Sequence, residues 1–177
     1  NLIAAERHAD RVLCDLENID LHGGMGIFEP QGRNTAAAVA VAAQVALADG
    51  DLLALVVPSD HEITTTADFW KTIESGVEAA KAGRIVVFGI PPAHPETGYG
   101  YIEAGTAFDG REDRDVRRFV EKPDSQKAES YLAAGNYFWN AGIFLFRGSV
   151  MRDAFLAHAP EIWSGVEKAV AGAERDE

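Results

Sequence analysis

Two continuous apolar runs, Leu52–Val57 and Ile85–Ile90, constrain the fold more than any other feature of the sequence. Each has the length of a strand and lacks polar–apolar alternation, so both are expected to be strands covered on both faces. Between them, Ala67–Ala82 has helical spacing and is followed by Gly83, a common helix stop. Strand, helix and strand in this order predict a parallel sheet with right-handed crossovers, and hence the α/β class.

The rest of the chain extends this pattern on both sides. Helical spacing predicts further helices at Ala5–Ile19, Ala36–Ala48, Ser125–Ala134, Ser149–Ala159 and Glu161–Ala171. A short strand is predicted at Ile27-Phe28 and a buried strand at Ile143–Phe146. A hairpin-like excursion is predicted at Tyr99–Glu103 and Val116–Glu121, around the loop Gly105–Arg114. The expected architecture is a mostly parallel central sheet with helices on both faces and a small β excursion. Because no linker or repeat divides residues 1–177, we expect a single domain.

Charge and cysteine content narrow the classes of function. The 177 residues include 16 Lys and Arg against 28 Asp and Glu, a net charge of −12. That balance excludes charge-driven binding to nucleic acid and argues against docking on anionic membranes. The apolar stretches are too short to span a bilayer. Cys14 is the only cysteine, so no disulfide forms within the chain, and a cytoplasmic location is expected.

The segment after Ile27-Phe28 is the first candidate site, because ligands of parallel sheets bind beyond the carboxyl ends of the strands. The candidates are Glu29, Pro30, Gly32, Arg33, Asn34 and Thr35. Gly32 permits close approach of the backbone, and the helix that follows offers free amides to an anion. The Glu29 carboxylate can accept from adjacent N–H donors, such as those on the edge of guanine. Taken alone, the segment fits a purely structural loop slightly better, with Pro30 setting a turn and Asn34 capping a helix.

Asp60 follows the strand Leu52–Val57, where a carboxylate can hold magnesium against phosphate oxygens. Asp and Ser are also common turn residues, which gives a structural alternative. The neighbouring His61 is interpreted as structural, because no second His or Cys lies at the spacing of metal ligands.

A glycine-containing segment, Thr97, Gly98, Tyr99 and Gly100, follows the strand Ile85–Ile90. Its glycines would let backbone amides approach a ligand closely, and a tyrosine ring can flank a sugar face. A bend that joins the sheet to the excursion is the structural alternative.

Glu121 and Lys122 end the second strand of the excursion. Neighbours on a strand point to opposite faces, so the pair is either a solvated edge or is turned to one side by a terminal bend. In the second case Glu121 would accept sugar hydroxyls and Lys122 would counter a phosphate. Asn140 lies among aromatic residues, where an unpaired amide is costly, so it must have a partner in the backbone or in a ligand.

Five motifs occur in a recognisable order: EPQGRNTAA, VVPSDH, FGIPPAHPETGYGYI, RFVEKPD and YFWNAGIFLF. The set resembles the mannose-1-phosphate guanylyltransferases, most closely the bacterial long form that is often fused to a mannose-6-phosphate isomerase domain. The resemblance runs from about Glu6 to about Pro160, and its five spaced motifs make it specific. It implies a Rossmann-like nucleotide-diphospho-sugar transferase fold.

The resemblance also implies a reaction, in which GTP and mannose 1-phosphate give GDP-mannose and pyrophosphate with magnesium. By this resemblance Glu29–Thr35 face guanine and ribose, and Asp60 binds the metal. Thr97–Gly100 and Asn140 line the mannose, Glu121 holds sugar hydroxyls and Lys122 holds the phosphate, with Asp60 and Lys122 the catalytic pair. The five stretches should therefore converge on one cleft.

Two departures from the family pattern set limits on this expectation. The glycine-rich loop with its Arg and Pro-Lys pair is absent, as is a late segment bearing a tryptophan and an aspartate. We therefore expect an internal piece of a longer protein, incomplete at both ends and inactive by itself. A partial sheet would expose an edge, which suggests self-association into a homo-oligomer.

Three other functions compete with this interpretation. A nucleotidyltransferase for another sugar or base has the same chemistry, and a non-catalytic subunit that senses nucleotide sugars would keep the pocket. An NAD-binding dehydrogenase ranks low, because no Gly-x-Gly-x-x-Gly opens a helix after the first strand.

Overall fold

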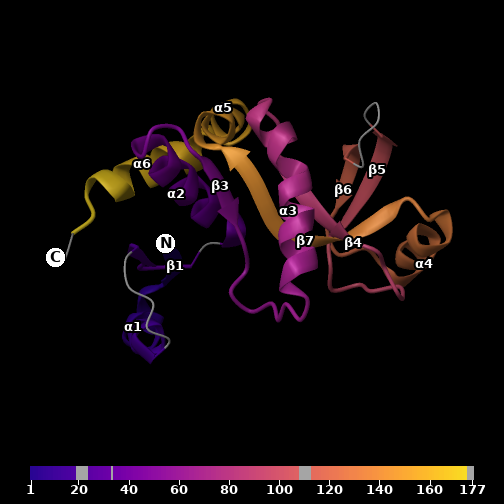
Figure 1. The fold of residues 1–177 in the computed structure, drawn as a ribbon, viewed down its shortest axis with the longest axis horizontal. Helices are drawn as coiled ribbons and strands as arrows, with labels where there is room; N and C mark the ends of the chain where they lie inside the picture. The colour runs from indigo at the N-terminus through magenta and orange to yellow at the C-terminus, as the bar shows by residue number, and fades with distance from the viewer. Residues whose placement is uncertain (19–23, 33, 108–112, 175–177) are drawn as a thin grey trace. The chain divides into compact units, whose positions relative to one another are not determined.

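The structure is a computed structural model that describes residues 1–18, 24–32, 34–107 and 113–174. The chain divides into two compact units, one of residues 1–41 with 155–177 and the other of residues 42–154. The boundary falls inside two helices, α2 (Asn34–Ala48) and α5 (Gly148–His158) (Figure 1). No helix in the described residues is both long enough and apolar enough to cross a membrane.

The unit that holds both termini contains a short parallel strand pair. Strands β1 (Leu2–Ala5) and β2 (Gly26–Glu29) pair in parallel, with Leu2 opposite Gly26. A 3-10 turn (Glu6–His8) leads into α1 (Ala9–Asn18), so the first helix begins four residues later than the sequence predicts. The predicted end of that helix, at residue 19, lies outside the described residues.

The final helix of this unit is α6 (Pro160–Ala171), which begins with proline in its first turn. Proline suits that position because its missing N–H would have no partner within the helix. The ring of Phe155 stacks on that of Trp163, which is 3% exposed, so this contact forms part of the unit's apolar interior.

The second unit is built on a five-stranded sheet in which every pairing is antiparallel within the described residues. Its strands are β3 (Leu53–Val56), β4 (Val86–Ile90), β5 (Tyr101–Ala107), β6 (Arg114–Val120) and β7 (Tyr137–Arg147). Strand β7 is central. Phe144 pairs with Val56 on one edge of β7 and with Val87 on the other. β4 therefore occupies one edge, while β3 and β5 share the opposite edge.

The prediction of a mostly parallel sheet is wrong for this unit. Strands β3 and β4 do run in the same direction, as their connection through a helix predicts, because each is antiparallel to β7. They are not neighbours, however, since β7 lies between them. The order of strands and helices along a chain predicts direction, but it does not exclude insertion of a later strand.

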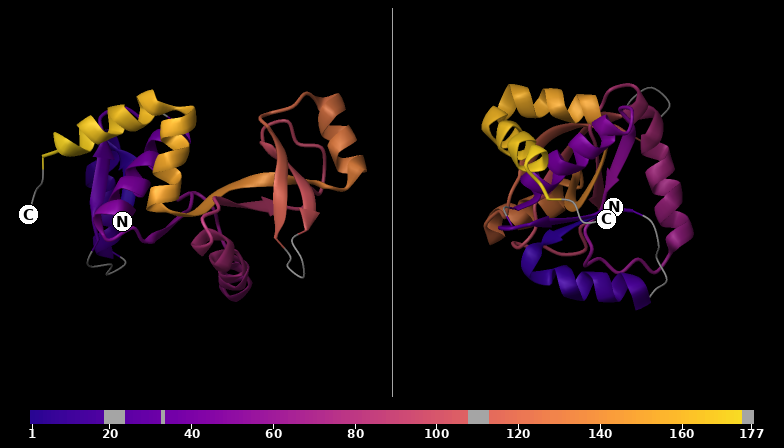
Figure 2. Two further views of the ribbon diagram at one scale, coloured as in Figure 1. Left: turned by 90° about the horizontal axis from the view of Figure 1, so that it is seen from above. Right: turned by 90° about the vertical axis from the view of Figure 1, so that its left-hand side faces the viewer.

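Helix α3 (Thr66–Lys81) covers one face of this sheet, and α4 (Ser125–Ala134) packs beside the β5–β6 hairpin (Figure 1). The α3 core contains Ile73, Ala80, Ala141, Ile143 and Leu145. The α4 core contains Tyr101, Ala128, Tyr131 and Tyr137. Figure 2 shows the hairpin and α4 at one end of β7 and α5 at the other. Together these two cores hold β7 from Tyr137 to Leu145, and the candidate site lies beside the middle of the strand.

Candidate functional site

β3 and β5 pair with the same edge of β7, and the gap between them lies beside the middle of β7. β3 pairs with the carboxyl-terminal part of β7 and β5 with its beginning. In the gap, the Asn140 N–H donates to the carbonyl oxygen of Gly100 over 2.8 Å. The Pro58 ring lies against Gly142, where an added Cβ would be 3.3 Å from Pro58 Cγ. The segments that follow β3, precede β5 and cross the middle of β7 therefore meet here.

A turn of the backbone at the end of β6 brings Lys122 to this gap. Its φ of 43° lies in the left-handed region, which is uncommon for lysine. The Lys122 N–H donates to the Tyr99 carbonyl over 3.2 Å, and its Nζ lies 3.7 Å from Oε1 of Glu121. The bend that would turn both side chains to one side is thus present, while both remain more than half exposed.

Gly100 has a steric reason to be glycine. A Cβ at this position would lie 2.8 Å from Phe119 Cζ and 2.9 Å from Oε2 of Glu121, distances that side chains do not adopt. The Glu121 carboxylate therefore lies directly against the Gly100 backbone. We call Tyr99, Gly100, Glu121, Lys122 and Asn140 the Gly100 cluster.

Asn140 has the partner that its surroundings require. Its side-chain oxygen accepts a hydrogen bond from the Gly142 N–H over 3.2 Å, so the prediction of a partner is confirmed and the partner is backbone. The Nδ2 group of Asn140 makes no hydrogen bond within the described residues. Its two N–H donors can therefore serve a ligand hydroxyl.

The Tyr99 backbone belongs to the Gly100 cluster, but its ring packs on the face of β7 opposite to the Asn140 side chain. It contacts Trp139 edge-on, with ring centres 5.4 Å apart, and His94 meets Trp139 in the same way at 5.0 Å. Because successive residues on a strand point to opposite faces, Trp139 and Asn140 lie on opposite faces of β7. A sugar bound beside Asn140 would therefore meet the backbone of Tyr99 rather than its ring.

Glu96 and Tyr101, to which the sequence alone assigns no role, fix the segment that carries Thr97 and Gly98. The Glu96 N–H donates to the Tyr101 hydroxyl over 2.9 Å, and Glu96 Oε1 accepts from the Gly98 N–H over 2.8 Å. The hydrogen bond from Gly98, followed by the one from His94, lowers the pKa of the Glu96 carboxyl. Thr97 and Gly98 are exposed in the turn that results. The side chains known to bond the backbone two residues on are chiefly those of Asp and Asn, so a glutamate at position 96 gives no sequence signal for this turn.

Asp60 lies in an exposed turn two residues after Pro58. No group of three or more His, Cys, Asp or Glu side chains in the described residues is arranged to hold a metal ion. Magnesium bound with a nucleotide needs only one or two carboxylates, because phosphate oxygens supply further ligands. The single carboxylate of Asp60 therefore has the right donor chemistry for a magnesium ion shared with substrate phosphates.

The predicted nucleotide segment belongs to the unit that holds both termini. Glu29 ends β2, and partial burial raises the pKa of its carboxyl. Pro30 and Gly32 are exposed, and a Cβ added at Gly32 would meet no atom within 4 Å. Asn34, with a φ of 53°, begins α2, and Thr35 is exposed in its first turn. Arg33 lies outside the described residues.

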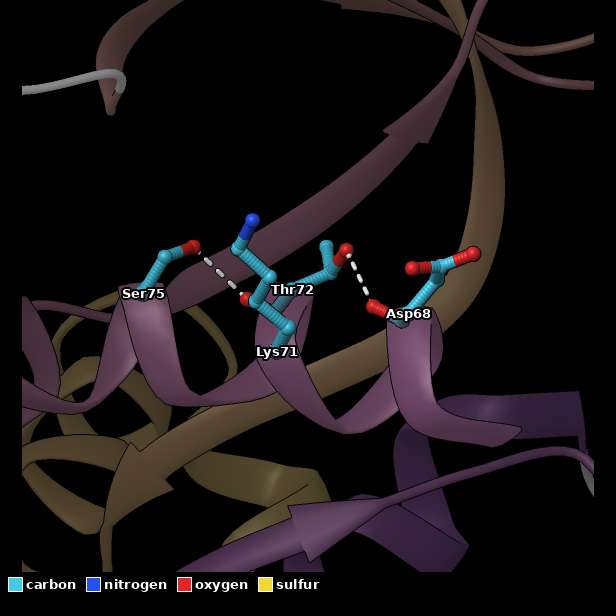
Figure 3. A pocket seen from close by; sticks show the side chains of 4 residues that line it. All are labelled: Asp68, Lys71, Thr72 and Ser75. Carbon is cyan, nitrogen blue, oxygen red and sulfur yellow. Dashed lines mark hydrogen bonds between the residues drawn. The ribbon is translucent and has the colours of Figure 1, made fainter. Parts of the chain in front are cut away.

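A separate hollow of about 360 Å³ lies along α3 and is lined by Asp68, Lys71, Thr72 and Ser75 (Figure 3). Its hydroxyl groups are already used within the helix. Thr72 Oγ1 donates to the Asp68 carbonyl over 2.9 Å, and Ser75 Oγ donates to the Thr72 carbonyl over 2.7 Å. This surface therefore lacks the converging free groups that the Gly100 cluster offers.

Comparison with known proteins supports the motif-based resemblance. The model of the family described as nucleotidyl transferase matches residues 2–177. The xanthan biosynthesis protein XanB of Xanthomonas campestris pv. campestris is 44% identical over 176 residues, which are 99% of this chain and 37% of that protein. The mannose-1-phosphate guanylyltransferase of Sinorhizobium fredii is 48% identical over 153 residues, 85% of this chain and 30% of the relative. The chain thus spans well under half the length of these relatives.

Solved structures share the fold. A crystal structure from Thermus thermophilus, described as a mannose-1-phosphate geranyltransferase, has a TM-score of 0.84 and 34% identity. It aligns with 98% of this chain and 50% of its own. A Helicobacter pylori structure described as a mannose-6-phosphate isomerase has a TM-score of 0.86 and 31% identity over 98% of this chain and 65% of its own.

Proposed function

This chain belongs to the nucleotidyl transferase family, and from that premise we propose that the complete protein joins GTP and mannose 1-phosphate into GDP-mannose and pyrophosphate. The identity to proteins named mannose-1-phosphate guanylyltransferase supports the choice of substrates, at 48% for the Sinorhizobium fredii protein and 38% for that of Escherichia coli.

The Gly100 cluster is the observation that carries the proposal. Two backbone hydrogen bonds, from Asn140 to Gly100 and from Lys122 to Tyr99, bring three segments together. These segments carry the Lys122 ammonium group, 3.7 Å from the Glu121 carboxylate, and the Asn140 side-chain amide. An ammonium suits a phosphate, whereas a carboxylate and an amide suit the hydroxyls of a sugar. A phosphorylated hexose presents both kinds of group.

In this proposal the sugar phosphate is held by Lys122, while Glu121 and the Asn140 amide orient the sugar ring. One phosphate oxygen of mannose 1-phosphate forms a bond to the α-phosphorus of GTP, and the bond from that phosphorus to the leaving oxygen breaks. Pyrophosphate carries away the electron pair. The attacking phosphate is already ionised near neutral pH, so the residues act by positioning and by neutralising charge. Thr97 and Gly98 would line the sugar beside the backbone of Tyr99 and Gly100.

Magnesium and the nucleotide would be held by other residues. Asp60 would hold the metal, which supplies charge neutralisation at the phosphates when bound. The nucleotide segment would contact guanine and ribose through Glu29, Pro30, Gly32, Arg33, Asn34 and Thr35. Partial burial raises the pKa of the Glu29 carboxyl, because it leaves the ionised form poorly solvated. N–H donors on the edge of a base would compensate that form.

The test measures pyrophosphate release by the complete protein with mannose 1-phosphate and, in turn, GTP, ATP, UTP and dTTP. We expect GTP to give the highest kcat/KM. Preference for another nucleotide would identify a transferase for another base, and binding of GDP-mannose without turnover would identify a sensing subunit.

A matched pair of lysine variants tests the role of the Gly100 cluster. Lys122→Ala should raise the KM for mannose 1-phosphate and lower kcat, because it removes the cation facing the phosphate. Lys127→Ala removes an equally exposed lysine on α4, which pairs with Asp124 at 2.9 Å, and should leave both constants unchanged. Equal effects of the two variants would contradict the assignment.

A further inference from the structure

We propose that Glu96 is a positioning residue, which preforms the turn that presents Thr97 and Gly98 to the sugar phosphate without touching the substrate itself. This inference rests on the proposed function, because it concerns the same binding site. It assigns a role to a carboxylate that lies outside the Gly100 cluster.

Glu96 is anchored from behind by a buried side chain. Its N–H donates to the hydroxyl of Tyr101, a residue that is 0% exposed. The Tyr101 ring meets that of Tyr131 on α4 at 5.4 Å, and Tyr131 stacks on Tyr137 at 4.1 Å. Because a close-packed aromatic cluster moves little, the Tyr101 hydroxyl offers a fixed point of attachment at the start of the turn.

The Glu96 carboxylate then closes the turn. Oε1 accepts the Gly98 N–H over 2.8 Å, and Oε2 lies 3.5 Å from Nε2 of His94. The Glu96 side chain is only 33% exposed, so it is mostly covered by its neighbours. The Gly98 N–H is consequently committed to Glu96, so the exposed side chain of Thr97 is the hydrogen-bonding group that the turn presents, with Gly98 beside it.

The far end of the turn is held by backbone. The Tyr99 and Gly100 carbonyls accept from the N–H groups of Lys122 and Asn140. Between these anchored ends, the Glu96 side chain restrains Thr97 and Gly98 through its hydrogen bond to the Gly98 N–H. A flexible segment containing glycine loses much conformational entropy when it is ordered on binding. A carboxylate that orders it beforehand reduces this loss and favours binding of the sugar phosphate.

The experiment uses the complete protein with Glu96→Ala and Glu96→Gln. We expect Glu96→Ala to raise the KM for mannose 1-phosphate about tenfold while the KM for GTP stays within about twofold. Glu96→Gln keeps an oxygen that accepts the Gly98 N–H, so it should restore the KM to within about threefold of the wild type. Glu129→Ala removes an exposed carboxylate on α4 and serves as the control, with no change in either KM.

Hydrogen exchange gives a second reading that does not depend on turnover. In the ligand-free protein, Glu96→Ala should speed exchange of the Gly98 amide while protection of the β7 amides, and the unfolding temperature, stay unchanged. If Glu96 contributed only to global stability, the exchange rates of the Gly98 and β7 amides would rise together.

The outcomes separate the two proposals. A wild-type protein that turns over mannose 1-phosphate, with an unchanged KM in Glu96→Ala, overturns the positioning role and leaves the proposed function standing. A wild-type protein that neither binds nor turns over mannose 1-phosphate overturns the proposed function. An equal rise in both KM values, or an unaltered exchange rate at Gly98, also overturns the positioning role. Should Glu96→Ala fail to fold, Glu96→Gln compared with Glu96→Met, an unbranched side chain without an oxygen to accept the Gly98 N–H, applies the same criteria.

Discussion

Substitution of Gly100 by alanine tests the geometry of the Gly100 cluster at its tightest point. The new Cβ would lie 2.8 Å from Phe119 Cζ and 2.9 Å from Oε2 of Glu121, whereas ordinary contact begins at 3.4 Å. The ring and the carboxylate must therefore withdraw by about 0.6 Å and about 0.5 Å. Gly100 does not have a positive φ, so the backbone itself accepts alanine.

The cost in stability should be small, because both obstructing atoms are ends of half-exposed side chains. Phe119 is 48% exposed, and the Glu121 side chain is 61% exposed, so each has room to move. Overpacking costs about 1–3 kcal/mol, and the lower end applies here. Reduced freedom of the unfolded chain offsets about 0.4–1 kcal/mol of that. We therefore expect the free energy of unfolding to fall by less than about 1 kcal/mol.

The cost in substrate binding should be larger. The displaced Glu121 carboxylate no longer meets the sugar hydroxyls at hydrogen-bond distance, which predicts a rise of about tenfold in the KM for mannose 1-phosphate. The KM for GTP should not change. Urea unfolding and steady-state kinetics on the complete protein measure the two quantities separately.

Gly165→Ala is the matched control for this substitution. A Cβ at Gly165 would meet nothing within 4 Å, and the residue lies inside α6. Alanine there should stabilise the helix by roughly 0.5–1 kcal/mol and leave both KM values unchanged. The steric reasoning is refuted if Gly100→Ala lowers stability by more than about 3 kcal/mol, or if it binds mannose 1-phosphate as the wild type does.

Three further predictions concern stability. Phe146→Ala, at a fully buried side chain of β7, should lower the free energy of unfolding by about 3–5 kcal/mol in urea titrations, and a loss below about 1 kcal/mol would show that the site collapses. The Asp51 carboxylate accepts hydrogen bonds from the Ser149 hydroxyl and N–H, and these lower its pKa. The stability that Asp51 contributes is therefore complete above about pH 4 and is lost as the pH falls through the lowered pKa. The difference in urea midpoint between wild type and Asp51→Ala should therefore be larger at pH 7 than at pH 3, and a constant difference would contradict this assignment. Tyr101→Phe removes the acceptor of the Glu96 N–H and should lower the free energy of unfolding by about 0.5–1.5 kcal/mol. Urea unfolding measures this change, with Tyr131→Phe for comparison, and an unchanged free energy of unfolding would count against this hydrogen bond.

Local signals in the sequence locate the helices well. Helix α4 has the predicted bounds, Ser125–Ala134, because its start and stop signals act within a few residues. The Asp124 side chain accepts from the Lys127 N–H at the beginning, and Gly135 takes a left-handed φ of 72° at the end. Such capping residues need no distant partner, so a local pattern suffices to predict them.

Strands depend on partners that the local pattern does not specify. The sequence does not predict β1 (Leu2–Ala5), because four residues are too few to show a period. It predicts β7 only at Ile143–Phe146, whereas the strand begins at Tyr137 and includes the aromatic residues before Asn140. Pairing with β4 and β5 extends β7 over these residues, and the residues that pair lie more than thirty positions apart in sequence.

The error in the sheet prediction and the assembly of the Gly100 cluster have one physical origin. Motifs predict residues that could face a ligand, and the structure brings Gly100, Glu121, Lys122 and Asn140 together by hydrogen bonds or close contacts. What brings them together is the antiparallel β7, which the expected parallel sheet lacks. If β3 and β4 were adjacent, the edge of β7 that β3 and β5 share would not exist, and Asn140 could not bond to Gly100. The feature that the periodicity of the sequence could not predict is therefore the one that assembles the candidate site.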